Sequence, residues 1–218
     1  MNINAEWHAH NKMPKNPTLD QRVRWHLAHA RHCGCRPLHG EVLEEIKKRY
    51  VGTHQEFWVF FTRRDHTALA EWAAACAERV LPFFEVKHPQ DARPHHAIET
   101  LYEWINTGQF RMAAIRSASL ASHAAAREVA PQDPAACYAA RAAGQAVATA
   151  HVPTHALGAA LYAIKAIAAT QPANLMDVVA QEHTWQLQNI PANLRDWVEA
   201  GLRQNQHLLS KDLREIFS

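Results

Sequence analysis

The chain is poor in glycine and has no long uninterrupted apolar segment. Its 218 residues include only 7 glycines, which argues against a fold of many short strands joined by glycine-rich turns. Its longest apolar runs are diluted with alanine and broken by His151, Pro153 and His155, so we expect no membrane-spanning helix. The opening residues, MNINAEWHAHNK, lack the apolar region of a secretory signal, and we expect none.

Charge of one sign is not concentrated anywhere, and cysteine is scarce. The 23 Lys and Arg residues and the 21 Asp and Glu residues give a net charge of +2, without a long block of either sign. This balance disfavours a dedicated nucleic-acid-binding protein, which usually carries a concentrated basic surface, and equally an acidic mimic of DNA. The 4 cysteines form no disulfide framework. We therefore expect a reduced, cytoplasmic protein that binds neither nucleic acid nor a membrane.

Alanine is the most abundant feature of the central third of the chain. Between Ala113 and Ala169 there are 24 alanines in 57 residues. Alanine is the best helix former, and its small side chain lets neighbouring helices approach closely. The stretch from Ala139 to Ala169 carries almost no charge, so it belongs in the middle of a bundle. The sequence predicts an all-α fold, a multi-helix bundle of roughly eight to ten helices with an alanine-rich central helix pair.

Helix boundaries can be located from their capping residues. Thr18, followed three residues later by Gln21, forms a capping box that predicts a helix start. Pro153 either begins a helix or kinks a continuous one, because it removes an internal hydrogen bond. Three acidic residues are expected to cap later helices, namely Asp65, Asp91 and Asp133.

The chain divides by composition into two parts. Residues 1–50 predict a small helical unit rich in histidine and cysteine, and residues 51–218 predict an alanine-rich helical domain. The aromatic cluster from Phe57 to Phe61 favours a strand by propensity. Because no partner strand is evident, we expect a connector or short helix there.

Histidine and cysteine cluster near the N-terminus. Six candidate ligands lie close together in the sequence, namely His26, His29, His32, Cys33, Cys35 and His39. Imidazole and thiolate are the ligands that zinc prefers, and four of the six could complete a tetrahedron. The Cys-x-Cys spacing is tighter than the usual Cys-x-x-Cys knuckle, so the alternative is a cysteine in the core beside solvent-exposed histidines. We predict no obligatory cofactor, with zinc at this cluster as the candidate.

A second group of polar residues interrupts the alanine-rich segment. His151 and His155 lie four apart and would share one helix face if the helix continued through Pro153. The residues between them include no glutamate, so the base of the zincin pattern is missing. The pattern favours a hydrogen-bonded histidine pair that stabilises a helix junction. A binding pocket is the alternative, with these polar neighbours: His123, Arg127, Arg141 and Gln145.

A third group, Asp91, Arg93 and Glu99, could form an ion-pair network at a helix start. Helix capping and a favourable interaction with the helix dipole account for an acidic residue at Asp91, so its presence requires no functional role. The sequence contains no P-loop, dinucleotide-binding glycine pattern, nucleophile elbow or kinase signature. We therefore predict no catalytic residue and expect a binding protein rather than an enzyme, although the enzyme question stays open.

Four segments of the chain resemble a known family. They are ALAEWAAACAERVLPFFEVKHPQDARPHHAIETLYEW, SHAAAREVA, AARAAGQAVATAHVPTHALGAALYAIKAI and EHTWQ. Across about residues 65–186 the chain is similar to bacterial immunity proteins of polymorphic toxin systems, the immunity-five-like helical family. The resemblance implies an all-helical domain that binds and neutralises a toxin, and it supplies no catalytic residues. Recurring family positions are matched here by Asp91, Arg93, His123, Gly144, His151 and His155.

Together these observations predict a non-enzymatic cytoplasmic immunity protein that presents a helical surface to a protein toxin. Its candidate binding residues are Asp91, Arg93, His123, Arg141, His151 and His155. A homo-oligomer is compatible with the sequence. The alternative is a metal- or small-molecule-binding helical protein that uses the N-terminal His/Cys cluster or the region of His123, His151 and His155. A third hypothesis is a helical enzyme that uses those histidines as acid and base.

Overall fold

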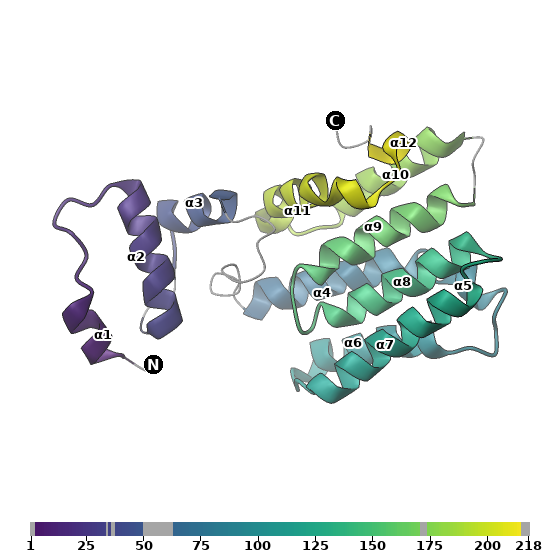
Figure 1. Cartoon of the computed structure of the whole chain (residues 1–218), viewed down its shortest axis with the longest axis horizontal. Helices are drawn as coiled ribbons and strands as arrows, with labels where there is room; N and C mark the ends of the chain where they lie inside the picture. Colours follow the sequence, from purple (N-terminus) through teal and green to yellow (C-terminus); the bar gives the residue numbers. More distant parts are fainter. Residues whose placement is uncertain (1–2, 34, 36–37, 50–62, 171–173, 215–218) are drawn as a thin grey trace. The chain divides into compact units, whose positions relative to one another are not determined.

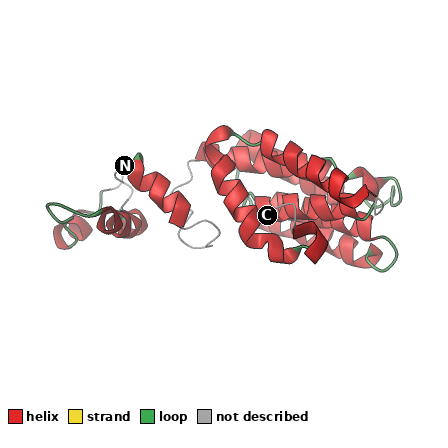
Figure 2. Ribbon diagram, turned by 90° about the horizontal axis from the view of Figure 1, so that it is seen from above, coloured by secondary structure: helices red, strands yellow, loops and turns green. Residues whose placement is uncertain are grey.

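The computed structural model describes residues 3–33, 35, 38–49, 63–170 and 174–214. Every regular element in these residues is a helix, which confirms the predicted all-α class (Figure 2). The chain forms two compact units, Met1–Thr62 and Arg63–Ser218. The predicted division after residue 50 and the expected connector at Phe57 to Phe61 lie outside the described residues and stay predictions.

In its described residues, the N-terminal unit contains three helices, and two of them form a small core. The three helices are α1 (Ala5–His10), α2 (Leu19–His32) and α3 (Glu41–Arg49) (Figure 1). The predicted capping box begins α2: the Gln21 N–H donates to Thr18 Oγ1 at 3.2 Å, and the Thr18 N–H donates to Gln21 Oε1 at 3.0 Å. The core of the unit is a cluster of four buried aliphatic side chains from α2 and α3, namely Val23, Leu27, Val42 and Ile46. A core of this size supplies little stability by itself.

The larger unit is a helical bundle arranged around α8. Its helices are α4 (Arg63–Glu78), α5 (Pro82–Glu85), α6 (Arg93–Thr107), α7 (Met112–Val129), α8 (Pro134–Ala148), α9 (His155–Ala168), α10 (Leu175–Gln188), α11 (Ala192–Asn205) and α12 (Lys211–Arg214), with a 3₁₀ turn at Gln206–Leu208. Helix α8 packs against α4, α5, α6, α7 and α9 (Figure 1). All but one of its alanines are buried, and Ala139 and Ala143 are fully so. This confirms the alanine-rich central pair, which is α8 with α9.

The predicted helix boundaries agree with the structure in part. Asp133 caps α8, since its side chain accepts from the Ala136 N–H at 3.1 Å. Asp65 does not occupy the cap position, because α4 begins at Arg63 and Asp65 lies in its first turn. Helices α8 and α9 are separate, and Pro153 lies in the connection between them. Among the described residues no helix combines the length and apolarity that a membrane span requires.

Candidate functional site

Helix α8 exposes a single row of larger side chains to solvent. Ten of its 15 residues are buried, and the partly exposed ones recur at three- and four-residue spacing, which places them on one helix face. Helix α9 repeats this pattern beside it. We call the row on both helices the α8–α9 stripe: Tyr138, Arg141, Gln145, His155, Tyr162 and Lys165.

Two tyrosines and two cations contact one another across the helix pair. The rings of Tyr138 and Tyr162 are stacked, with centroids 6.2 Å apart and planes 25° apart. Lys165 Nζ lies 5.0 Å from the Tyr138 centroid and 5.3 Å from the Tyr162 centroid, and Arg141 Cζ lies 5.9 Å from the Tyr162 centroid. Contacts of this kind are attractive, because the ring face carries negative charge. They hold the cations over the tyrosines at the surface of the bundle.

The other end of the stripe is a hydrogen-bonded pair. His155 Nδ1 lies 2.7 Å from Gln145 Oε1, so the imidazole donates to the amide oxygen. A Cβ atom at Gly158 would come within 2.8 Å of that oxygen, so glycine at this position leaves room for the Gln145 side chain. His151 lies in the connection before α9, where it is exposed and faces Phe110 at 6.4 Å between centroids. No helix continues through Pro153, so His151 and His155 do not share a helix face.

The three central histidines line one cavity of about 270 Å³. His123 comes from α7, His155 from α9 and His151 from the connection between α8 and α9. Two of the other lining residues, Met112 and Leu120, are large apolar side chains that are 41% and 55% exposed. The cavity therefore combines imidazoles with an apolar rim that is open to solvent.

His123 lies against the backbone of α8. A Cβ at Gly144 would come within 2.9 Å of the His123 ring, so this close approach requires glycine. Ser119 supports the same contact, since its hydroxyl donates to the Gly144 carbonyl at 2.9 Å. Burial lowers the pKa of His123, and the charges of Arg141 and Arg127 lower it further. Arg141 thus acts on the cavity through its charge, and it is not among the residues that line it.

We expect mild acid to destabilise the larger unit. Burial lowers the pKa values of His66, His123 and His183 below 6.5 in the folded protein. The unfolded chain therefore binds protons more readily, and the free energy of unfolding falls as the pH drops below 6.5. Melting temperatures measured on either side of that pH should show the loss, and His123→Gln should reduce it. A melting temperature that rises or stays constant on acidification would contradict this expectation.

Asp91 and Arg93 form an ion-pair network with a partner other than the expected Glu99. The Arg93 guanidinium donates to Asp91 Oδ1 at 2.8 Å and to Glu128 Oε1 at 2.9 Å, which joins the start of α6 to the end of α7. These hydrogen bonds raise the pKa of Arg93 and lower those of both carboxyl groups. Glu99 instead pairs with His95 and His96. The network holds two helices together, and the stripe residues do not take part in it.

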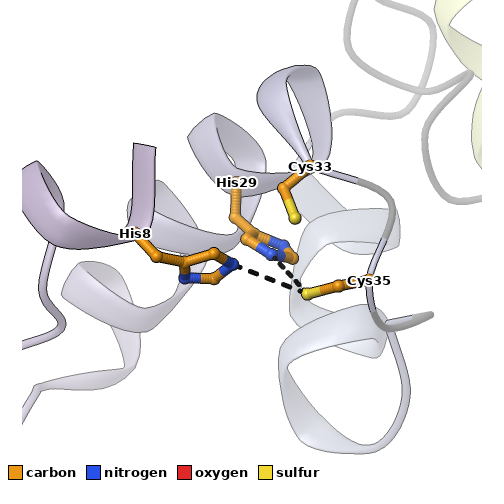
Figure 3. A group of neighbouring side chains, drawn as sticks. All are labelled: His8, His29, Cys33 and Cys35. Carbon is orange, nitrogen blue, oxygen red and sulfur yellow. Dashed lines mark hydrogen bonds between the residues drawn. The ribbon is translucent and has the colours of Figure 1, made fainter. Parts of the chain in front are cut away.

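In the N-terminal unit, two histidines and two cysteines converge. The ligand atoms of His8, His29, Cys33 and Cys35 all lie within 4.8 Å of one another. His29 Nε2 lies 3.2 Å from Cys35 Sγ, and His8 Nε2 lies 3.6 Å from the same sulfur (Figure 3). We call these four residues the His/Cys group. Within the described part of the chain, no other set of His, Cys, Asp or Glu side chains brings at least three potential metal ligands together in this way.

Neighbouring residues hold the His/Cys group in place. The Asn4 N–H donates to Cys33 Sγ at 3.4 Å, and this contact is the main reason why the pKa of the Cys33 thiol is lowered to about 7. The Trp25 ring stacks on the His29 imidazole, with centroids 4.9 Å apart and planes 8° apart. His29 is buried, so its ring is fixed by packing as well as by its polar contacts.

The group contains three of the six predicted ligands and lacks the other three, which include His39. His29, Cys33 and Cys35 are present, whereas His26 and His32 are outside the group. His26 packs edge-on against Trp25, and His32 stacks on Trp7. The sequence interpretation missed His8, because it lies 27 residues from Cys35 and no local spacing connects them.

The comparisons with known proteins concern the larger unit. A family model described as "Imm-5 like putative immunity protein" matches residues 60–193, more than half of the chain. The match includes the whole α8–α9 stripe and excludes the His/Cys group. No curated protein and no solved structure matches the chain. The expected family is confirmed, and the chain belongs to the Imm-5 like family of immunity proteins.

Proposed function

We propose that this protein binds and neutralises a protein toxin through the α8–α9 stripe. The observation that carries the proposal is the arrangement of Arg141 and Lys165 over the stacked rings of Tyr138 and Tyr162. This arrangement lies on the partly exposed face of a helix pair whose other faces are buried, inside the region that matches the immunity family. Tyrosine and arginine are enriched among the residues that dominate binding energy at protein interfaces.

The charge of the stripe indicates the chemistry of its partner. None of the six stripe residues is acidic. Among the described residues, no carboxylate forms an ion pair with Arg141, and Lys165 Nζ donates to the backbone carbonyl of Leu208 at 2.9 Å. Complementary charges steer association and fix its orientation. An acidic patch on the toxin would therefore be the matching surface.

The stripe by itself is smaller than a stable interface. Specific complexes bury about 1,200–2,000 Å² in total, so neighbouring surface must take part. The exposed apolar side chains of Phe110, Met112 and Leu120 supply such a surface, and two of them line the cavity beside Gln145 and His155. The buried alanine core of α8 and α9 keeps the surface rigid, which reduces the entropy lost on binding.

We further propose that the protein works in a reducing compartment, the cytoplasm. No disulfide joins Cys33, Cys35, Cys76 or Cys137, and disulfides are rare in that compartment. Reduced thiols at Cys33 and Cys35 also leave the N-terminal unit able to bind zinc.

We expect the toxin to be the product of a neighbouring gene, and the direct test uses that protein. We expect co-expression of the wild-type protein to restore growth to cells that produce the toxin, and the two purified proteins to form a stable complex. A toxin that is neither bound nor inhibited would contradict the proposal. Rescue of growth without binding would contradict the direct mechanism.

A further inference from the structure

We propose that the N-terminal unit is a structural zinc module in which His8, His29, Cys33 and Cys35 bind one zinc ion. His29 comes from α2, Cys33 and Cys35 follow the end of that helix, and His8 comes from α1. The proposal is independent of toxin binding, since all four ligands lie outside the residues that match the immunity family.

The distances between the ligand atoms fit a tetrahedral zinc site. Zinc–sulfur bonds of about 2.3 Å and zinc–nitrogen bonds of about 2.0–2.1 Å, at tetrahedral angles, place nitrogen and sulfur ligands about 3.5 Å apart. Cys35 Sγ lies 3.2 Å from His29 Nε2 and 3.6 Å from His8 Nε2. Figure 3 shows both imidazoles directed at this sulfur, with the Cys33 side chain next to the His29 ring. A small adjustment of the four side chains would therefore complete the tetrahedron.

The chemistry of the four ligands also suits the metal. Two thiolates and two neutral imidazoles neutralise the charge of Zn²⁺, so a partly buried site carries no net charge. Four protein ligands leave no open position for water or substrate, which is typical of a structural rather than a catalytic zinc site. Cys33 and His29 are buried, and His8 and Cys35 are partly exposed, so the ion would have a route of entry.

The residues around the group match the outer shell of a metal site. The backbone N–H of Asn4 donates to Cys33 Sγ, and the Asn4 side chain donates to the His32 carbonyl at 3.1 Å. The same side chain accepts from the Trp7 N–H at 3.0 Å and so caps α1. Hydrogen bonds to ligand atoms orient metal ligands and tune them. One residue thus connects the start of α1, the end of α2 and a proposed ligand.

A bound ion would have a clear structural task in this unit. Helix α1 has only 6 residues and none of them is buried, so the hydrophobic core does not hold it. A helix of that length is unstable in isolation. Zinc would join α1 to α2 through His8 and would supplement the small core of α2 and α3. In modules of this kind, the free energy of metal binding is also free energy of folding.

The test measures metal in the purified full-length protein. After removal of loosely bound metal, we expect zinc in a one-to-one ratio to protein. Replacement of zinc by cobalt should give the intense visible absorption of a tetrahedral site and the near-ultraviolet charge-transfer band of thiolate ligands. A wild-type protein without stoichiometric zinc, or a cobalt spectrum without thiolate bands, would overturn the proposal.

Matched variants identify the ligands. Loss of an outer-shell partner weakens metal binding by roughly 10–100-fold. We expect His8→Ala, which removes a ligand, to weaken zinc binding by at least this factor. Cys35→Ser should abolish stoichiometric binding. His10→Ala, on the same helix as His8, and His26→Ala, on the same helix as His29, should keep full zinc content. Equal zinc loss in His26→Ala and His8→Ala, or zinc retained in Cys35→Ser, would overturn the ligand assignment. Because the cobalt spectrum is recorded on the wild-type protein, misfolding of a variant cannot produce a false result.

Discussion

Trp72→Ala is expected to lower the free energy of unfolding of the larger unit by about 3–5 kcal/mol. Trp72 lies on α4 and is only 2% exposed, so its loss leaves a large cavity in the core. Its indole N–H donates to the Gln186 carbonyl at 2.8 Å and connects α4 to α10. The substitution therefore removes both packing and a buried hydrogen bond. Chemical denaturation of the two proteins measures the difference.

Trp72→Phe separates these two contributions. Phenylalanine keeps much of the apolar volume but leaves the Gln186 carbonyl without its donor, which costs about 1–3 kcal/mol. The alanine variant should therefore be clearly less stable than the phenylalanine variant. Equal stabilities would show that packing at this position contributes little. An alanine variant as stable as the wild type would contradict the account of the core.

Arg79→Ala is expected to lower the free energy of unfolding by about 2–3 kcal/mol. This is somewhat less than the typical decrease when a buried ion pair is broken. Arg79 Nε lies 2.8 Å from Glu182 Oε2, and the Glu182 side chain is only 1% exposed. Removing the cation leaves a buried carboxylate without its charged partner. The cost is reduced because Arg79 itself is 40% exposed and solvent screens the pair.

The pH dependence of this variant tests the reason for its instability. Burial raises the pKa of Glu182 above 4.5, and loss of Arg79 removes a contact that lowers it. The folded variant then takes up a proton more readily than the unfolded chain, so its penalty should shrink as the pH falls toward the pKa of Glu182. Adding Glu182→Gln should restore stability at neutral pH, because the amide oxygen can still accept from Gln186. A penalty that is independent of pH and unaffected by the second substitution would indicate lost packing instead.

The fold was largely predictable because its main signals are local. The alanine-rich segment is visible in the composition, and the capping box of Thr18 and Gln21 and the Asp133 cap each depend on residues within one helical turn. Asp65 was placed at a helix start, and it lies in the first turn instead. An acidic residue is favourable at both positions, so the sequence pattern does not separate them.

The candidate sites were less predictable because they join distant segments. His8 reaches Cys35 across 27 residues, and a spacing rule cannot detect such a pair. The stripe carried a usable signal, since Tyr138 and Arg141 stand three residues apart among alanines, as do Tyr162 and Lys165. Their pairing across α8 and α9 depends on how the two helices pack. Gly144 and Gly158 could be noted in the sequence. The sequence did not show that they make room for the side chains of His123 and Gln145.

The binding role of the stripe is tested most directly by isothermal titration of the purified toxin into Arg141→Glu. Arg195→Glu is the matched control, since it makes the same change of charge on the exposed face of α11. We expect Arg141→Glu to weaken toxin binding by at least about 30-fold, the effect of losing one dominant interface residue, and the control to bind as the wild type does. Circular dichroism should show that both variants remain folded. If the toxin binds Arg141→Glu as tightly as it binds the wild type, the stripe is not the toxin-binding surface.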